Sequence, residues 1–161
     1  MRLLLIAECP SLEALIRAQV AHHWPEGEVR LWSPQHQGSL PAEFLAQGYD
    51  AVLIAERWSG TEGLDWLREL GARPGFAKTV FVADQPHATL VRTAAAAGAQ
   101  AVLDVSGSEP VQWRALLQEV ADAQRLALGD WRVSDQAREA QRFGDAYIPG
   151  YRRVRVLARG P

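Results

Sequence analysis

Residues 49–70 read YDAVLIAERWSGTEGLDWLREL, and this stretch decides the fold class. The apolar run over 51–55 is typical of a buried strand, a glycine-containing loop follows it, and Leu64 and Leu67 then recur at helical spacing. A strand, a loop and a helix in this order begin a βαβ unit. In such units the reactive side chain usually stands at the carboxyl end of the strand, where this chain has Ala55.

Four other apolar runs repeat the strand signal on both sides of this stretch. In chain order, the five runs, including the one just quoted, lie over residues 2–7, 28–32, 50–55, 78–83 and 101–104. Because helical patterns fill the gaps between the runs, we predict an α/β protein with a parallel sheet. The first, third and fourth runs are almost continuously apolar, as in central strands that are covered on both faces. The run over 28–32 is mixed, which favours an edge strand.

The predicted helices have recognisable ends. We expect four helices over residues 9–24, 61–70, 86–98 and 108–128, and a shorter one over 41–48. Pro10, Pro86 and Pro110 stand near three of the starts, where proline is tolerated, and Gly129 follows the last helix as a terminator. That last helix has about five turns and is longer than a helix needs to be to cover a short strand.

The length and composition set the number of domains. With 161 residues, 48% of them hydrophobic, the chain can bury one core. We predict a domain over residues 1–129. Residues 130–161 are expected to form a linker or tail that leads to a further effector domain, with a helix capped by Ser134 and a strand pattern at Val154 and Val156.

The charge and the cysteine content exclude several classes of protein. A net charge of -2 and a pI near 6.1 give no field that would attract nucleic acid or an acidic membrane. Cys9 is the single cysteine, and no apolar run approaches the roughly 18 residues of a membrane span. The sequence therefore predicts a cytoplasmic protein.

Signatures of metal or cofactor chemistry are missing from the sequence. The four histidines, His22, His23, His36 and His87, have no cluster of cysteine or acidic residues at metal-ligand spacing. There is no nucleophile elbow and no phosphate-binding loop. We expect neither a metal nor a cofactor, and no enzymatic activity.

Two stretches carry a resemblance to a known family. The strings YDAVLIAERWSGTEGLDWLREL and AAAAGAQAVLDV, together with the order of elements over residues 1–129, resemble the receiver domain of two-component response regulators. The resemblance implies a flavodoxin-like (βα)5 fold, with a five-stranded parallel sheet in the order 2-1-3-4-5 and helices on both faces. It also implies a functional site at the carboxyl ends of the strands.

The reactive positions of that family are changed in this chain. The acidic pair that holds Mg²⁺, the phosphoacceptor, the hydroxyl residue and the lysine fall on Ala7, Glu8, Ala55, Ala83 and Val105. If the register slips by one residue, the hydroxyl position falls on Asp84 instead. The family's switch aromatic falls on Val102.

An acyl phosphate cannot form on these side chains. The reaction needs a carboxylate nucleophile, a metal held by carboxylates, and a cation that offsets the phosphoryl charge. Because the acids and the cation are depleted together, the sequence predicts a degenerate, phosphorylation-independent receiver. Two alternatives remain open: phosphate acceptance on Glu56, Ser59 or Thr61, or a small-ligand sensor in the vacated pocket near Ala7, Ala55 and Ala83.

Without chemistry, the domain is expected to act by contact. The resemblance implies a dimer face on the fourth helix, the fifth strand and the last helix, to which we assign Leu90, Val91, Val102, Trp113, Leu117 and Val120. The stripe on the last helix fits the core face of that helix equally well. We predict a homodimer that regulates a protein partner or a fused effector.

The end of the chain gives a clue to that effector. IPGYRRVRVLARGP, residues 148–161, resembles the opening of a bacterial Ser/Thr protein kinase domain, with Ala158 at the first loop glycine. The resemblance implies that this chain is the front part of a longer kinase fusion and has no kinase activity of its own.

Overall fold

The computed structural model describes residues 1–58 and 61–143, and the side chains of 1–56 and 63–129 among them. The chain divides into two compact units, Met1–Ala127 and Leu128–Pro161. The first unit contains the sheet and the positions of the candidate site. The predicted strand at Val154 and Val156 and the kinase-like residues 148–161 lie outside the described residues.

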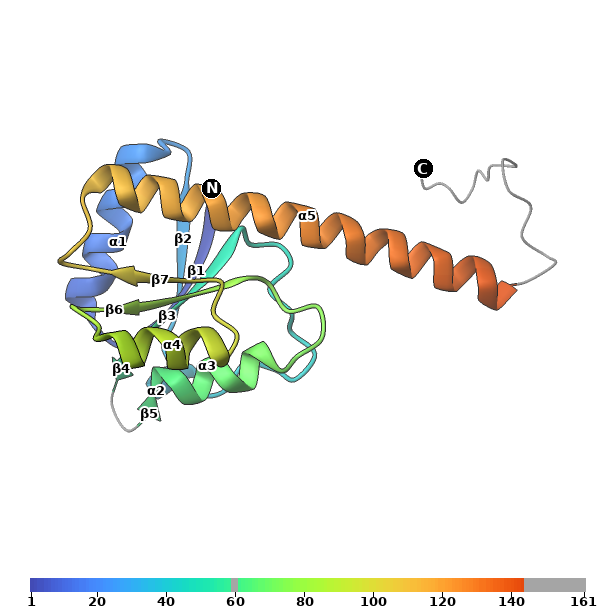
Figure 1. The fold of residues 1–161 in the computed structure, drawn as a ribbon, viewed down its shortest axis with the longest axis horizontal. Helices are drawn as coiled ribbons and strands as arrows, with labels where there is room; N and C mark the ends of the chain where they lie inside the picture. Colours follow the sequence, from blue (N-terminus) through green and yellow to red (C-terminus); the bar gives the residue numbers. More distant parts are fainter. Residues whose placement is uncertain (59–60, 144–161) are drawn as a thin grey trace. The chain divides into compact units, whose positions relative to one another are not determined.

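A parallel five-stranded sheet forms the centre of the first unit (Figure 1). Its strands are β1 (Arg2–Ile6), β2 (Glu28–Trp32), β3 (Ala51–Ala55), β6 (Thr79–Ala83) and β7 (Ala101–Asp104), in the order β2-β1-β3-β6-β7. All five predicted strands are confirmed, and the mixed run is indeed an edge strand. The register pairs Ile6 with Ile54 and Ala55 with Val82.

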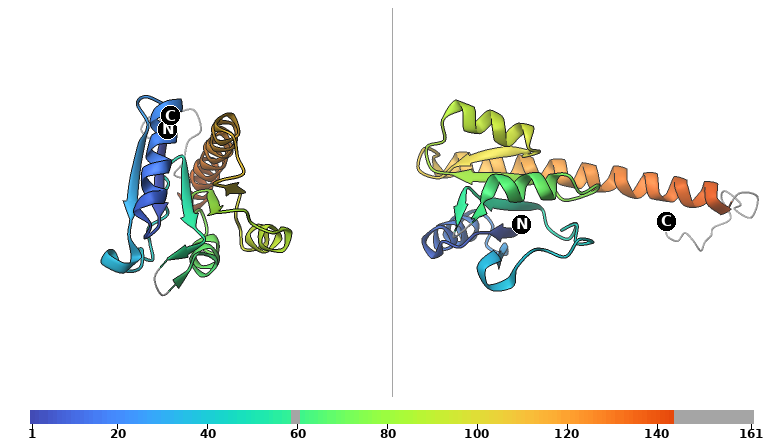
Figure 2. Two further views of the ribbon diagram at one scale, coloured as in Figure 1. Left: turned by 90° about the vertical axis from the view of Figure 1, so that its left-hand side faces the viewer. Right: turned by 90° about the horizontal axis from the view of Figure 1, so that it is seen from below.

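Helices cover both faces of the sheet. They are α1 (Pro10–His23), α3 (Gly63–Gly71), α4 (Ala88–Ala96) and α5 (Pro110–Phe143). Since crossovers between parallel strands are right-handed, the change of direction at β1 sends α1 to one face and α3 and α4 to the other. The left panel of Figure 2 shows α1 and the start of α5 on the same side of the sheet, with α3 and α4 opposite.

The core lies between these layers. Its largest fully buried side chains come from the central strands and from α1, α3 and α5, and include Phe81, Leu53, Ile16, Leu67 and Trp113. Burying a side chain of this size contributes about 1.5 to 3 kcal/mol. The uninterrupted apolar runs of β3 and β6, in which every residue is buried, follow from this double cover.

The prediction of a shorter helix over residues 41–48 is wrong. The structure has turns there, and a single helical turn, α2 (Pro34–Gln37), stands earlier in the connection. Arg73, just after α3, holds the irregular segment: its guanidinium donates to the carbonyls of Pro41, Phe44 and Leu40 at 2.7, 2.9 and 3.2 Å. A side chain thus supplies the donors that helical amides would have supplied.

The end of the last helix also differs from the prediction. We expected Gly129 to terminate it, whereas α5 continues through Gly129 to Phe143. A glycine inside a helix costs only about 1 kcal/mol relative to alanine, and the following QAREAQR is rich in strong helix formers. No helix among the described residues is both long and apolar enough to span a membrane.

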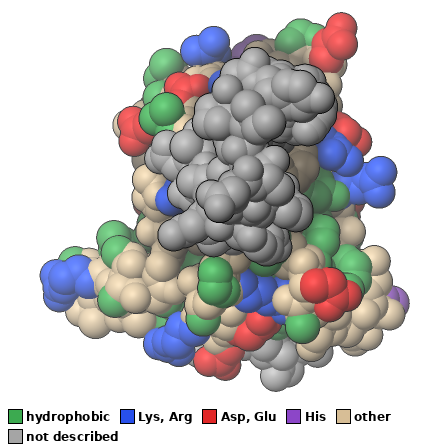
Figure 3. Space-filling model, turned by 90° about the vertical axis from the view of Figure 1, so that its right-hand side faces the viewer, with side chains coloured by type: hydrophobic (Ala, Val, Ile, Leu, Met, Phe, Trp, Pro, Cys, Tyr) green, Lys and Arg blue, Asp and Glu red, His purple; other side chains and the backbone are tan. Residues whose placement is uncertain are grey.

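Opposite charges hold the amino ends of the strands. Asp50, just before β3, accepts a hydrogen bond from the backbone N–H of Arg2 at 2.8 Å and lies 3.7 Å from the guanidinium of Arg125. Arg2 also pairs with Glu28 at 2.8 Å. Figure 3 looks onto this side of the molecule and shows basic and acidic side chains interspersed around it.

Candidate functional site

The predicted site positions come together at the carboxyl edge of the sheet, by which we mean the end at which its parallel strands finish. Ala55 and Ala83 are the last residues of β3 and β6, while Ala7 and Val105 directly follow β1 and β7. The order β1-β3-β6-β7 makes these four strands neighbours, and the backbone N–H of Val105 donates to the carbonyl of Ala83 at 2.9 Å. The structure therefore gathers the four positions along one edge.

These four positions are apolar, and three of them are buried. Ala7, Ala55 and Ala83 are 0%, 3% and 3% exposed, and the half-buried Val105 packs against the core. A methyl group offers neither a lone pair for attack on phosphorus nor an oxygen for a metal. The central position of the edge, Ala55, can therefore take no part in phosphoryl transfer.

Glu8, the surviving member of the acidic pair, has a structural role. Its carboxylate accepts a hydrogen bond from the Ser33 hydroxyl at 2.6 Å and another from the backbone N–H of Gln35. Ser33 Oγ also lies 2.8 Å from Nδ1 of His36. Because the hydroxyl gives its one proton to Glu8, the contact requires His36 Nδ1–H to donate to Ser33. Glu8 thus braces the connection between β2 and α2.

Two further carboxylates at this edge bind the connecting loops. Asp84 accepts a hydrogen bond from the hydroxyl of Ser106. Asp104 Oδ1 accepts from the backbone N–H groups of Gln85 at 2.9 Å and Gly107 at 3.1 Å. The sequence pattern pointed to Asp84 but not to Asp104. The position of Asp104, one residue before the predicted site position Val105 in the string AVLDV, was the available signal.

The described side chains do not assemble a metal site. No three His, Cys, Asp or Glu residues come close enough together in the described part of the chain to hold an ion. Among the described residues, Glu8, Asp84 and Asp104 form no ion pair with lysine or arginine. Each carboxylate instead accepts at least one hydrogen bond from a loop that follows another strand, and no three of the described acids converge on one point.

The loop after β3 begins with a close backbone approach. The N–H of Gly63 donates to the carbonyl of Glu56 at 2.7 Å, and a Cβ at Gly63 would overlap the carbonyl oxygen of Ala55. Glycine is therefore required for packing, independently of any phosphate. A two-stranded hairpin, β4 (Arg57–Trp58) with β5 (Thr61–Glu62), fills this loop. The side chains of Ser59 and Thr61, two of the alternative phosphate acceptors, lie outside the described part of the structure.

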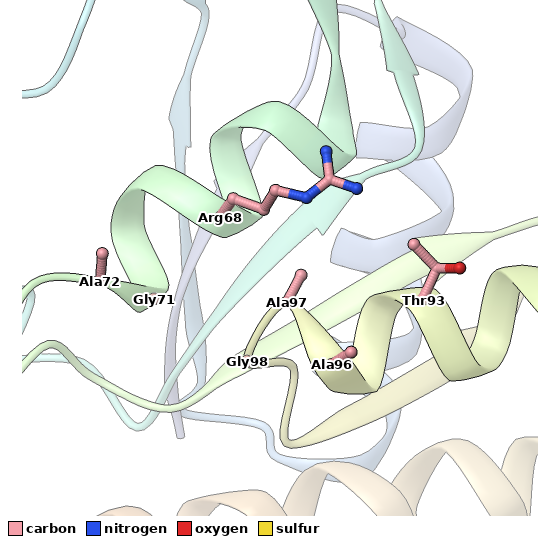
Figure 4. A pocket seen from close by; sticks show the side chains of 7 residues that line it. All are labelled: Arg68, Gly71, Ala72, Thr93, Ala96, Ala97 and Gly98. Carbon is pink, nitrogen blue, oxygen red and sulfur yellow. The ribbon is translucent and has the colours of Figure 1, made fainter.

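A cavity of about 430 Å³ lies away from this edge, between α3 and α4. Figure 4 shows Arg68 extending from α3 and Thr93 on α4, with glycine and alanine along the rest of the wall. Its lining includes Gly71 and Gly98, which stand at the ends of the two helices, and none of the predicted site residues. Ala7, Ala55 and Ala83 therefore do not line it.

The structure corrects half of the predicted interaction surface. Trp113, Leu117 and Val120 are 2%, 0% and 2% exposed, so they belong to the core of the single chain and are unavailable to a partner. Leu90 and Val102 are partly buried, while Val91 is 38% exposed. Among the predicted residues, only those on α4 and β7 still offer surface.

Comparison with solved structures identifies the architecture. A receiver domain (CheY-like) from Methanospirillum hungatei aligns with a TM-score of 0.60 at 18% identity, over 77% of this chain and 95% of its own. The receiver domain of a sensor histidine kinase from Pseudomonas aeruginosa, solved with a magnesium ion in its active-site cleft, aligns with a TM-score of 0.60 at 20% identity, over 75% and 97%. The chain has the receiver fold.

The receiver fold is shown by geometry and not by sequence similarity. No family model and no curated protein matches the chain. NtrX from Brucella abortus aligns with a TM-score of 0.61 at 12% identity, over 84% of this chain but only 29% of NtrX. The flavodoxin-like sheet order predicted from the resemblance is confirmed.

Proposed function

We propose that this protein is a receiver-fold signalling module that accepts no phosphoryl group and regulates a protein partner or a fused effector by contact. One observation carries the proposal: the carboxyl end of the central strand β3 is Ala55, a buried methyl group, in a fold whose relatives include a magnesium-bound receiver domain. Without a nucleophile, binding is the activity that remains to this edge of the fold.

The hydrogen bonding of the remaining acids supports this proposal. Glu8 is engaged by Ser33 and Gln35, and Asp104 is engaged by Gln85 and Gly107. These donors turn the carboxylates toward the loops, and no three acidic or histidine side chains of the described residues come together to hold a metal ion. The edge therefore fits a structural role better than phosphoryl chemistry.

Phosphorylation assays with small-molecule donors test this function. The protein is incubated with acetyl phosphate and Mg²⁺, and separately with beryllofluoride and Mg²⁺, and is then examined by mass spectrometry and thermal unfolding. We expect no gain in mass and no rise in Tm with either reagent. A phosphoryl adduct would contradict the proposal, and peptide mapping would show whether Glu56, Ser59 or Thr61 accepts it.

The contact surface that we propose consists of Leu90, Val91 and Val102, on α4 and the edge strand β7. We propose that it mediates a homodimer or receives a protein partner in the cytoplasm, with no role for nucleic acid or a membrane. The likeness of residues 148–161 to the start of a kinase domain points to a fused effector as the recipient of the signal.

A matched pair of substitutions tests this surface. Val91→Asp and Leu15→Asp alter side chains that are 38% and 37% exposed on opposite faces of the sheet. Light scattering is expected to show that Val91→Asp shifts the protein from dimer to monomer, whereas Leu15→Asp leaves the dimer intact. A monomeric parent protein, or equal effects of both substitutions, would contradict the proposed dimer.

A further inference from the structure

Two loops at the carboxyl edge are joined by one side chain. The first follows β6 and leads to α4, and the second follows β7 and leads to α5. Asp104, the last residue of β7, accepts through Oδ1 from the N–H of Gln85 in the first loop and from the N–H of Gly107 in the second. One carboxylate oxygen therefore bridges two segments that are separated by 22 residues of sequence.

Further hydrogen bonds support the same bridge. The Ser106 hydroxyl in the second loop donates to the carboxylate of Asp84 in the first. The N–H of Val105 donates to the carbonyl of Ala83 at 2.9 Å. The second loop thus reaches the end of β6 through a backbone amide and the first loop through a hydroxyl, in addition to the bridge at Asp104.

The backbone is adapted to this bridge at both of its amides. Gln85 has a φ of 49°, a left-handed conformation that is unfavourable for a non-glycine residue unless surrounding contacts compensate. At the other amide, a Cβ at Gly107 would overlap the carboxylate of Asp104, so glycine permits the close approach. The left-handed backbone at Gln85 and the absence of a side chain at Gly107 thus accompany hydrogen bonds to the same acceptor, Asp104 Oδ1.

We propose that Asp104 is a positioning residue that latches the loop before α4 to the loop before α5, without a ligand or a modification. The latched loop enters α4 through His87, whose Nδ1 accepts from the N–H of Leu90 at 3.1 Å. The start of α4, which carries Leu90 and Val91, is consequently held in one position relative to β7. This latch depends on the geometry of the two loops and does not require the proposed function.

Amide hydrogen exchange, followed residue by residue by NMR, tests the latch. Asp104→Ala removes the acceptor and is expected to speed exchange at the Gln85 and Gly107 amides by about tenfold or more, because a hydrogen bond to a charged group stabilises by roughly 1.5 to 3 kcal/mol. Asp104→Asn keeps one neutral oxygen and should have a smaller effect. Amides of the central strands, such as those of Leu4 and Leu53, should keep their parental rates.

Asp122→Asn is the matched control, because Asp122 is an exposed acid that bonds to Gln118 and Arg125 on its own helix. It should leave both loop amides unchanged. Gly107→Ala is an independent second variant that keeps Asp104 but displaces its carboxylate, and it should speed exchange at Gln85. Unchanged rates at Gln85 in both Asp104→Ala and Gly107→Ala, or a uniform increase over all amides, would overturn the latch.

Discussion

The carboxyl and amino edges of the sheet, the two ends of its parallel strands, are held by opposite kinds of side chain. At the carboxyl edge, the carboxylates of Glu8 and Asp104 accept hydrogen bonds from backbone amides of the connecting loops. At the amino edge, Arg73 donates to three backbone carbonyls and Asp50 meets Arg125. Among the described side chains, carboxylates accept the loop hydrogen bonds at the first edge, whereas guanidinium groups donate at the second.

This difference separates charge that supports structure from charge that supports chemistry. A phosphoryl site needs anions and a cation that converge on one point, and open α/β sheets place their ligand sites at the carboxyl ends of the strands. Here the edge has buried alanines at the central position and on both neighbouring strands, while its acids are turned to the loops. The charges at both edges therefore hold the chain in place.

The largest expected effect comes from placing an acid at the end of β3. Ala55→Asp would put a carboxylate at a site that is 3% exposed, with the aliphatic Val105 and no cationic residue directly after β7. An unpaired buried charge is strongly unfavourable, so we expect the free energy of unfolding to fall by about 3 kcal/mol. Urea denaturation measures the change. Ala55→Ser, neutral and of similar size, should cost clearly less.

The carboxyl edge would prove to be a latent reactive site if Ala55→Asp had the opposite result. An Ala55→Asp protein as stable as the parent, which also gained mass with acetyl phosphate and Mg²⁺, would show that a single side chain separates this chain from a working receiver. The conclusion that the charges at the carboxyl edge serve only the structure would then be wrong.

The second effect concerns the amino edge. Arg73→Ala removes the donor for the carbonyls of Leu40, Pro41 and Phe44 and should lower the free energy of unfolding by about 2 kcal/mol, since the side chain is only 12% exposed. Thermal or urea unfolding measures the loss. Arg73→Lys keeps the charge but not the planar fork, so it should recover only part of the stability.

Arg68→Ala is the control for this prediction. Arg68 lies on α3, one and a half turns before Arg73, but is 55% exposed and pairs with Asp65 at 3.4 Å, so its loss should cost no more than about 0.5 kcal/mol. Equal losses for the Arg68 and Arg73 variants would show that Arg73 does not brace the segment over residues 38–50.

The smallest expected effect is the neutralisation of Asp50. Asp50→Asn retains an oxygen for the N–H of Arg2 but loses the charge that faces Arg125, so we expect a loss of about 0.5 to 1 kcal/mol. The difference between parent and variant should shrink at about 1 M salt, because salt screens exposed charges. A loss that does not change with salt would indicate a packing role in place of an electrostatic one.

The sheet was predictable because its signal is local. Uninterrupted apolar runs such as 51–55 mark strands that are covered on both faces, and all five strands appear at the predicted places. The segment over 41–48 was not predictable in the same way. Its conformation depends on Arg73, a residue 25 or more positions further along the chain, and such a long-range donor leaves no mark in a local pattern.

The interaction surface shows the same limit. A helical stripe such as Trp113, Leu117 and Val120 buries itself equally well against a sheet or against a partner, because its spacing records only that one face is apolar. The fold resolved this ambiguity in favour of the core.

The sequence by itself determined that β3 ends in a methyl group and that a valine follows β7, because the local apolar pattern defines where each strand ends. Only the tertiary structure decided what the remaining acids do. Glu8 and Asp104 meet loop amides that are distant in sequence, and the direction of a carboxylate depends on which donors the folded chain brings within hydrogen-bonding distance.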